Sequence, residues 1–436
     1  MTDKKAVVIG GGLAGVEAAN QLSKRGVKVT LYEMKPCKFS PAHKNENLGE
    51  LVCSNSLKAA RLGSAAGMLK AEMRLFGSVC LDAADVAQVP AGGALAVDRD
   101  VFSKLITQTI ENDENITLIR EEITEIPDAD VVIIAAGPLM SEALAEKVAE
   151  LCGKSFLSFY DAAAPIVTAD SIDMENAFTQ SRYDRGGEDD YINCPLNKEE
   201  YESFYEELIN AESAELHSFD KRKDVYEGCM PIEVLASRGK DAMRYGPLKP
   251  VGLTNPKTGH RPWANLQLRK ENKDGTMYNL VGFQTNLKFP EQKRVFSMFP
   301  ALKNAEFVRY GVMHRNTFLN SPGLLSYDFS MIKKPNIYFA GQISGVEGYM
   351  ESAASGILAG YNAARRLFGE EPIKLPKITM LGALSQYISD ESVKSFQPMG
   401  AAIGLVEPLG ETIKDKKERY ERIAQRSLDY YKSIDF

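Results

Sequence analysis

The first thirty residues alternate between apolar runs and a glycine-rich break. Residues 6–9 form a short apolar run, and three glycines follow it directly. Between residues 13 and 25 apolar side chains recur every three or four positions, which predicts an amphipathic helix that ends at Gly26. Residues 27–32 then form a second strand-like run that ends in Glu33. The pattern therefore predicts a β–α–β unit at the start of the chain.

Two further apolar runs, far apart along the chain, are predicted strands that lead into small residues. Residues 128–137 form the first run, which ends in two alanines and a glycine. Residues 336–342 form the second, and a helix rich in small residues is predicted from Ser352 to Ala364. Small residues at such places allow a backbone to approach a ligand closely.

The middle of the chain differs from the two ends in its pattern of predicted elements. Predicted strands at 166–172 and 278–286 and a predicted helix at 197–218 indicate mixed α/β structure without a fingerprint of its own. At 436 residues the chain is too long for one ordinary core, so two domains are expected. We predict a discontinuous first domain and an inserted mixed α/β domain, with the bounds 1–150 and 313–436 for the first and 151–312 for the second.

Composition sets limits on location and metal content. The hydrophobic fraction of 44% and the charged fraction of 25% are typical of a soluble globular protein. No apolar run is long enough to span a bilayer, and the first run ends in glycines rather than in a signal-peptide cleavage site. We expect a cytoplasmic protein without a membrane partner. The six cysteines and four histidines form no zinc-type cluster, so no metal is expected.

The glycine spacing after the first strand is that of a dinucleotide site. The three glycines of a Gly-x-Gly-x-x-Gly motif serve a tight turn, a close approach to the pyrophosphate and close helix–strand packing, while the helix N-terminus attracts phosphate. Glu33 lies where an acid for the ribose hydroxyl is expected. Together with the strand at 128–137 and the segment at 336–360, this favours FAD over NAD, in a Rossmann domain of the glutathione-reductase type. The predicted cofactor-binding residues are Gly10, Gly11, Gly12, Leu13, Ala14, Gly15, Glu33, Gly341, Gln342 and Gly345.

One window of the inserted segment is strongly basic although the formal net charge of the chain is −7. Between Arg238 and Lys270 there are eight basic residues and one acidic residue, Asp241. Tyr245 and Trp263, the only tryptophan, are interleaved with them. Cations and aromatic rings suit a phosphate backbone and an unstacked base; the alternative is a solvated basic face. A second basic run, at 414–426, alternates with acids and is explained by i,i+4 pairing on a helix.

Two of the six cysteines lie in settings that suit chemistry. Cys53 lies in a polar turn, Glu50 to Ser56, which we expect to cap a following helix, and a helix N-terminus activates a thiol. Cys229 lies between a glycine and a Met-Pro pair that stiffen its loop. Each is a candidate catalytic thiol, with an inert buried thiol as the alternative.

The chain resembles the folate- and FAD-dependent tRNA (uracil-5-)-methyltransferases, the TrmFO family, over essentially its whole length. The cysteine segments and the proline–glycine block are more specific than the FAD fingerprint. Trp263-Ala264-Asn265 departs from the Tyr-Ala-Val expected there. The resemblance rests on residues 8–15 (VIGGGLAG), 50–56 (ELVCSNS), 226–233 (YEGCMPIE), 246–253 (GPLKPVGL), 267–269 (QLR) and 340–349 (AGQISGVEGY).

This resemblance implies methylation at C5 of the T-loop uridine, position 54 of tRNA. It implies 5,10-methylenetetrahydrofolate as carbon donor, FAD as resident cofactor and NADH or NADPH as electron source. Such chemistry needs a thiolate that adds to C6 of uracil and a base that removes the C5 proton. We assign Cys229 as the C6 nucleophile and Cys53 as its acid–base partner, and the reverse order stays open. His314 and Arg315 are candidates for polarising the uracil oxygens.

Other hypotheses are compatible with parts of this sequence. The flavin segments alone fit a related FAD-dependent tRNA-modifying enzyme or a small-molecule flavoprotein oxidoreductase equally well. A catalytically silent RNA-binding flavoprotein is a third reading. The basic window favours an RNA partner over a small substrate, and the two thiols favour an enzyme over a silent binder.

Overall fold

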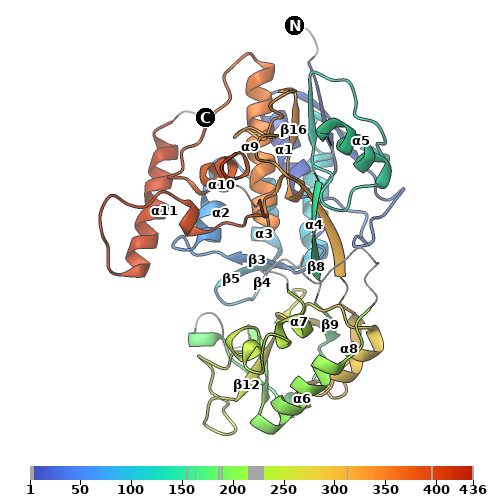
Figure 1. Ribbon diagram of the computed structural model, residues 1–436, viewed down its shortest axis with the longest axis vertical. Helices are drawn as coiled ribbons and strands as arrows, with labels where there is room; N and C mark the ends of the chain where they lie inside the picture. Colours follow the sequence, from blue (N-terminus) through green and yellow to red (C-terminus); the bar gives the residue numbers. More distant parts are fainter. Residues whose placement is uncertain are drawn as a thin grey trace.

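The chain folds into two lobes (Figure 1). The computed structural model describes residues 4–153, 156–162, 164–184, 187, 190–214, 230–311, 313–393 and 396–434. The upper lobe contains both the beginning and the end of the chain, and the lower lobe contains its middle, in green and yellow. Within the described residues, no helix combines the length and the apolar character needed to cross a membrane.

A five-stranded parallel sheet in the upper lobe joins strands from both ends of the chain. Its order is β16-β7-β1-β2-β6, and all neighbouring pairs are parallel. The inserted middle of the chain separates β7 from β16 in sequence, yet the two strands are neighbours. This topology confirms the predicted α/β fold of the glutathione-reductase type. The strands are β1 (Lys5–Ile9), β2 (Lys28–Glu33), β6 (Ile116–Arg120), β7 (Val131–Ile134) and β16 (Ile337–Phe339).

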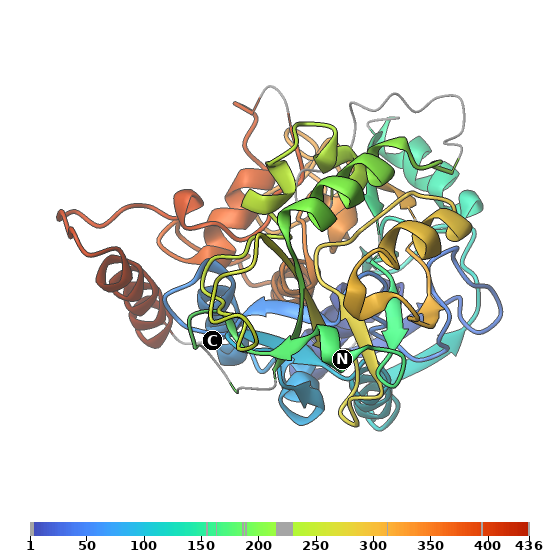
Figure 2. The same cartoon turned by 90° about the horizontal axis from the view of Figure 1, so that it is seen from below.

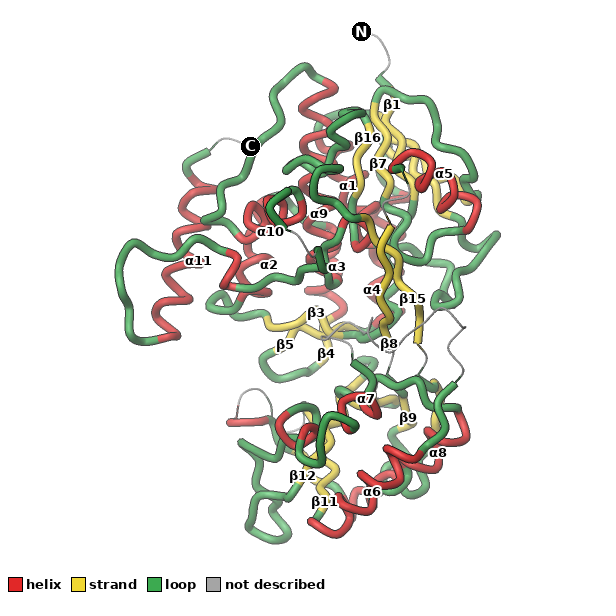
Figure 3. Tube along the Cα trace, in the orientation of Figure 1, coloured by secondary structure: helices red, strands yellow, loops and turns green. Residues whose placement is uncertain are grey.

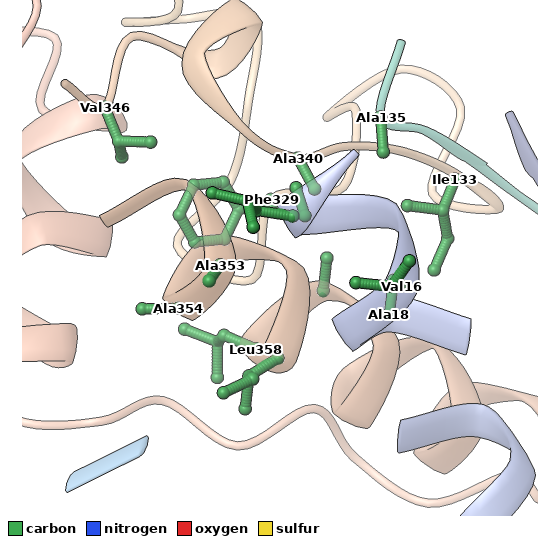
Figure 4. Close-up of a cluster of buried hydrophobic side chains, with 14 of the residues drawn as sticks. Val16, Ala18, Ile133, Ala135, Phe329, Ala340, Val346, Ala353, Ala354 and Leu358 are labelled. Atoms are coloured by element: carbon green, nitrogen blue, oxygen red, sulfur yellow. The ribbon is translucent and has the colours of Figure 1, made fainter. Parts of the chain in front are cut away.

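Helices α1 (Leu13–Lys24) and α9 (Tyr349–Leu367) lie side by side against this sheet. Two glycines of α9 make the close approach possible. A Cβ at Gly360 would lie 2.8 Å from Cα of Ala18, closer than any ordinary contact. Figure 4 shows small side chains of both helices, Ala18 of α1 and Ala353 and Ala354 of α9, in this cluster of buried residues. The N-terminal and C-terminal parts of the chain thus share one core.

The upper lobe also contains a small antiparallel sheet of order β3-β5-β4, which contacts helices α2 and α3. The buried carboxylate of Glu72 on α2 accepts hydrogen bonds from the first two amides of α10 and from Ser427 and Tyr431 of α11. It thereby holds α11, seen at the margin of Figure 2, against the lobe. The elements are β3 (Ser56–Ala59), β4 (Gln88–Val89), β5 (Ala94–Val97), α2 (Ala65–Leu75), α3 (Val79–Ala87), α4 (Arg99–Glu111), α5 (Glu142–Cys152), α10 (Met380–Ile388) and α11 (Lys416–Lys432).

The lower lobe is built on a six-stranded sheet of order β10-β11-β12-β13-β9-β14 with antiparallel neighbours. Its separate core includes Phe204, Phe283 and Phe299, whose rings pack within 6.1 Å of one another. The elements are β9 (Ile166–Thr168), β10 (Phe178–Thr179), β11 (Tyr191–Leu196), β12 (Ala264–Lys270), β13 (Met277–Leu280), β14 (Phe307–Arg309), α6 (Lys198–Asn210), α7 (Ile232–Ala236) and α8 (Phe289–Phe296).

A two-stranded ribbon leads into and out of the lower lobe. β8 (Phe156–Ala162) and β15 (Met313–Leu319) pair antiparallel, in full register from Phe156↔Leu319 to Ala162↔Met313. Figure 3 shows this pair, in yellow, running from the upper lobe towards the lower one. The domain limits at residues 150 and 313 stay predictions.

Several elements differ in length from their prediction. The helix predicted at 197–218 is α6, which starts behind a capping box at Asn197 and ends at Asn210; residues 215–218 lie outside the described part of the chain. The strand predicted at 278–286 ends at Leu280, because the chain turns at Gly282 with a φ of 81°. The strand predicted at 166–172 ends at Thr168, and α9 begins at Tyr349 rather than at Ser352.

Candidate functional site

A cavity of about 440 Å³ opens at the carboxyl edge of the parallel sheet. The segments that directly follow β1, β2, β7 and β16 form its walls. This edge is where open α/β sheets bind nucleotides, and the volume is that of a small-molecule site. Asn316 of β15 and Gln284, which follows β13, also line the cavity, so both lobes contribute to it.

The glycine-rich loop between β1 and α1 fits a dinucleotide. A Cβ at Gly15 would overlap the carbonyl group of Gly10, so Gly15 lets the helix pack closely on the strand. A Cβ at Gly12 would meet no protein atom within 4 Å, because Gly12 faces the cavity, where a side chain would take ligand space. Gly12 is also the N-cap of α1, without a side-chain cap, and its helix amides are therefore available to phosphate oxygens.

Glu33 ends β2 as a buried carboxylate on the cavity wall. One of its oxygens accepts from the backbone N–H of Gly11 at 2.8 Å, and the other accepts from that of Lys35 at 2.9 Å. The two bonds fix the carboxylate beside the glycine loop, in the place where an acid that binds a ribose hydroxyl is found in such sheets.

The C-terminal half of the cavity wall is built by the turn between β16 and α9. Gly341 adopts a φ of 85°, and its N–H donates to Ser355 Oγ at 2.7 Å. The side-chain amide of Gln342 donates to Glu347, which also lines the cavity. α9 begins after Gly348, again without a side-chain cap. Two uncapped helix N-termini, from opposite ends of the chain, therefore open into one cavity, as the two phosphates and the ring system of FAD require.

Nearly all predicted cofactor residues lie at this cavity, with two exceptions. Leu13 and Ala14 line it together with the glycines before them. Gly15 lies behind the wall in its packing role. Gly345 does not line the cavity: its φ of 90° shapes the turn, and a Cβ there would overlap the ring of Phe396. The need for glycine at position 345 thus comes from packing.

Cys53 lies on the wall of the same cavity. The expectation of a following helix is wrong, because strand β3 comes next. Instead, the hydroxyl of Tyr349, in the first turn of α9, accepts from the N–H groups of Cys53 at 2.7 Å and of Ser54 at 3.0 Å. Burial raises the pKa of Tyr349, so the hydroxyl keeps its proton. The backbone at Cys53 is therefore held by the helix whose N-terminus faces the cavity.

Two arginines bind the backbone around Cys53 from different elements. Arg99, the first residue of α4, donates to the carbonyl oxygens of Leu51 at 2.8 Å and of Cys53 at 3.3 Å. Arg309, at the end of β14 in the lower lobe, donates to the carbonyl oxygen of Val52. Burial lowers the pKa of the Arg309 guanidinium, and the charge of Arg99 lowers it further. Arg99 also forms an ion pair with the buried carboxylate of Glu271, so the charge of the two guanidinium groups at this wall is partly compensated.

A third arginine, Arg269 of β12, binds the side chains that follow Cys53. Its guanidinium donates to Asn55 Oδ1 at 3.0 Å and to Ser54 Oγ at 2.9 Å. Arg269 is only 6% exposed, so it does not belong to a basic surface as the sequence window implied. The loop at Cys53 is held by one arginine of the upper lobe and two of the lower lobe.

Other predicted catalytic residues cannot be placed in the same way. Cys229 lies outside the described residues. His314 and Arg315 lie on β15, where their backbones pair with Asp161 and Tyr160; their side chains lie outside the description.

Two functional candidates escaped the sequence interpretation. Tyr349 is part of the 340–349 motif, but no local pattern assigns its hydroxyl to the cysteine loop. Lys58 adopts a φ of 63° in a bulge of β3, and its Nζ donates to Glu351 Oε1 at 2.7 Å on the cavity wall. Strained backbone of this kind concentrates at functional sites.

The basic residues between 238 and 270 do not form one uniform surface, because individual side chains have different partners. Lys240 pairs with Glu202 at 3.0 Å, while the guanidinium of Arg244 lies 3.9 Å from the ring centre of Trp263. In the C-terminal run, Arg422 of α11 pairs with Glu418 at i,i+4, as the alternation of charges predicts.

Comparisons with known proteins agree on one family. The model of the glucose inhibited division protein A (GIDA) family matches residues 5–371. The methylenetetrahydrofolate–tRNA-(uracil-5-)-methyltransferase TrmFO of Acetivibrio thermocellus is 59% identical over 98% of this chain and 97% of its own length. The TrmFO of Enterococcus faecalis is 56% identical over 98% and 97%. Among solved structures, Aquifex aeolicus GidA shares the fold, with a TM-score of 0.71 and 17% identity over 99% of this chain and 74% of that one.

Proposed function

The chain belongs to the GIDA family and, within it, to the TrmFO methyltransferases, and on this premise we propose that it methylates C5 of the T-loop uridine, position 54, of tRNA. The carbon donor is 5,10-methylenetetrahydrofolate, and reduced FAD, regenerated by NADH or NADPH, is the reductant. The macromolecular partner is tRNA, and the folate and the nicotinamide are small-molecule partners.

The cavity residues divide the task of holding FAD. The loop at Gly10–Ala14 and the first turn of α1 would bind the pyrophosphate, and Glu33 the ribose of the adenosine half. Gly341, Gln342 and the first turn of α9 would surround the ring system. When bound and reduced, FAD supplies the hydride equivalent that converts a methylene group to a methyl group.

Two thiols would do the work on uracil. Cys229, as a thiolate, adds to C6 and makes C5 an enolate carbon that attacks the one-carbon electrophile. Cys53 would then take the C5 proton as the carrier of the one-carbon unit leaves, which gives an exocyclic methylene at C5. Once this methylene has gained a hydride equivalent, loss of the Cys229 sulfur from C6 restores the C5=C6 double bond of the methylated uracil. The guanidinium groups of Arg99 and Arg309, partly compensated by the carboxylate of Glu271, leave positive charge at this wall, where it would favour an enolate oxygen.

The observation that carries the proposal is the position of Cys53. Cys53 lines the cavity that the glycine-rich loop also lines, so a proton acceptor and a flavin would share one cavity. A flavoprotein that only binds RNA has no need of a loop held by Tyr349 and three arginines.

The test is incorporation of the one-carbon unit. Purified holoenzyme is incubated with an unmodified tRNA transcript, labelled methylenetetrahydrofolate and NADH or NADPH, and the RNA is digested. We expect label in 5-methyluridine. Unlabelled RNA from protein with bound, reducible FAD would overturn the proposal.

A second experiment assigns the two thiols. A T-arm containing 5-fluorouracil cannot lose its C5 substituent as a proton, so the adduct at C6 accumulates. We expect the covalent adduct with Cys53→Ala and none with Cys229→Ala. The opposite result would reverse the two roles.

A further inference from the structure

A second cavity, of about 770 Å³, lies in the lower lobe. We call it the Trp263 cleft. Its walls are formed by the start of α6, by the turn that precedes Gly246 and by the loop at 255–263, which leads directly into β12. It shares no residue with the cavity at Cys53.

Two aromatic side chains and an arginine, Tyr245, Trp263 and Arg244, line this cleft. Tyr245 is 87% exposed and Trp263 is 36% exposed, although both are large apolar rings. Arg244 lies over Trp263, and its Nε–H donates to the carbonyl oxygen of Trp263 at 3.0 Å while Nη1 binds Asp241 at 2.7 Å. These two hydrogen bonds hold the guanidinium over the ring, with its central carbon 3.9 Å from the ring centre. Exposed aromatic rings and arginine planes are surfaces on which unpaired bases stack.

Positive charge surrounds these planes. Lys198, Lys257 and Arg261 are exposed residues of the cleft, and with Arg244 they make four cations. Three carboxylates oppose them, those of Glu175, Glu200 and Asp241, the last of which is bound to Arg244. Glu200 is already bound by the backbone N–H at the N-cap of α6. Such a balance suits a phosphodiester backbone.

Strand β12 sets the distance between the cleft and the cysteine loop. Arg269, near its end, binds the side chains beside Cys53, and Trp263 directly precedes its first residue. Six residues of extended chain span about 20 Å. A uridine that reaches Cys53 cannot also fill the cleft, so the cleft would meet another part of the same RNA.

We propose that the Trp263 cleft is a second tRNA contact, which takes phosphates and one unstacked base about 20 Å from the target uridine. This inference rests on the proposed function, since it takes tRNA as the substrate. The cleft holds the RNA in place while the T-loop enters the flavin cavity. Its contribution therefore belongs to binding and not to the chemical step.

The test compares holoenzymes that differ only in the cleft. For Tyr245→Ala combined with Arg261→Ala we expect the Kd for a fluorescent unmodified tRNA transcript and the KM for methylation to rise at least about fivefold. The kcat and the flavin absorbance should not change. The fall of affinity between about 50 and 200 mM salt should also become less steep. Tyr245→Phe, which keeps the ring, should bind like the wild type.

A matched control is Phe368→Ala. Phe368 is 51% exposed and lies 5.4 Å from a lysine ammonium, but it belongs to the far end of α9. It should leave Kd and KM unchanged. A double variant with wild-type Kd and KM would overturn the proposal and leave the cleft to another partner, such as a protein. Wild-type enzyme that binds tRNA without methylating it would refute the proposed function. The change in Kd between the wild type and the double variant would still show whether the Trp263 cleft contacts tRNA.

Discussion

Replacing Gly356 by alanine should force α1 and α9 apart and weaken the binding of FAD. A Cβ at this position would lie 2.7 Å from the carbonyl carbon and 2.8 Å from Cα of Ala14, with the carbonyl oxygen closer still, whereas ordinary contacts begin at 3.4 Å. The obstacle is helix backbone, which cannot rotate away. Overpacking costs about 1–3 kcal/mol and alanine returns about 1 kcal/mol of helix propensity, so we expect a net loss of up to about 2 kcal/mol. Ala14 lines the cavity, and its displacement deforms the cofactor site.

The assay measures the free energy of unfolding of the apoprotein in urea and the flavin absorbance that remains after gel filtration. Gly12→Ala is the first control: its Cβ would meet no protein atom within 4 Å, so it should lose FAD while the apoprotein keeps its stability. Gly404→Ala, also with free space, should keep both. A Gly356→Ala protein with wild-type stability and full FAD would refute the packing argument.

Three other predictions concern the cysteine loop and the C-terminal helix. Tyr349→Phe removes the oxygen that accepts hydrogen bonds from the Cys53 and Ser54 amides. Because an unpaired buried donor costs about 1–3 kcal/mol, kcat for methylation should fall about tenfold while the flavin absorbance stays complete. An unchanged kcat would contradict this. Arg269→Met leaves two acceptors, Asn55 Oδ1 and Ser54 Oγ, without the hydrogen bonds of Arg269. The free energy of unfolding in urea should fall by about 1–3 kcal/mol. An unshifted urea midpoint would disprove this prediction. Burial raises the pKa of Glu72 from 4.5 to about 7. The protonated side chain therefore adds about 3 kcal/mol to the free energy of unfolding. This contribution is present below pH 4.5 and is lost as the pH rises to about 7. Glu72→Gln should lack this loss in urea titrations at several pH values, and an equal pH dependence in both proteins would argue against it.

Local patterns in the sequence predict the elements of the upper lobe but not their order in space. The unit from β1 to β2 follows from apolar periodicity and a glycine break, which act over a few residues. The pairing of β7 with β16 depends on contacts between residues about two hundred positions apart, and only the shared flavin fingerprint indicated it. Element ends also follow from local turns, as at Gly282, where the chain leaves the sheet.

At the candidate site, local spacing predicts which residues of the glycine-rich loop lie together at the cavity. The glycines at 10–12 and Glu33 lie as the spacing requires. The setting of Cys53 was misjudged because a Ser-Asn-Ser turn precedes a helix or a strand equally well. Arg269 looked like one of eight surface cations, since charge counts cannot tell a buried guanidinium from a solvated one. Its partner Asn55 is 214 residues away in sequence, and no local signal joins them.

The three arginines make the position of Cys53 depend on both lobes. A loop on its own leaves a thiol free to take many positions, but here Arg269 and Arg309 reach the loop from strands of the inserted sheet, while Tyr349 reaches it from α9. The ribbon of β8 and β15 brings the inserted lobe to this place, and the hydrogen bonds of the arginines hold it there. Because each of these groups is fixed by its own core, a displacement of the lower lobe must break charged hydrogen bonds or move the cysteine loop. The two glycine-rich ends build the cofactor cavity, and the inserted segment sets where the thiol stands within it.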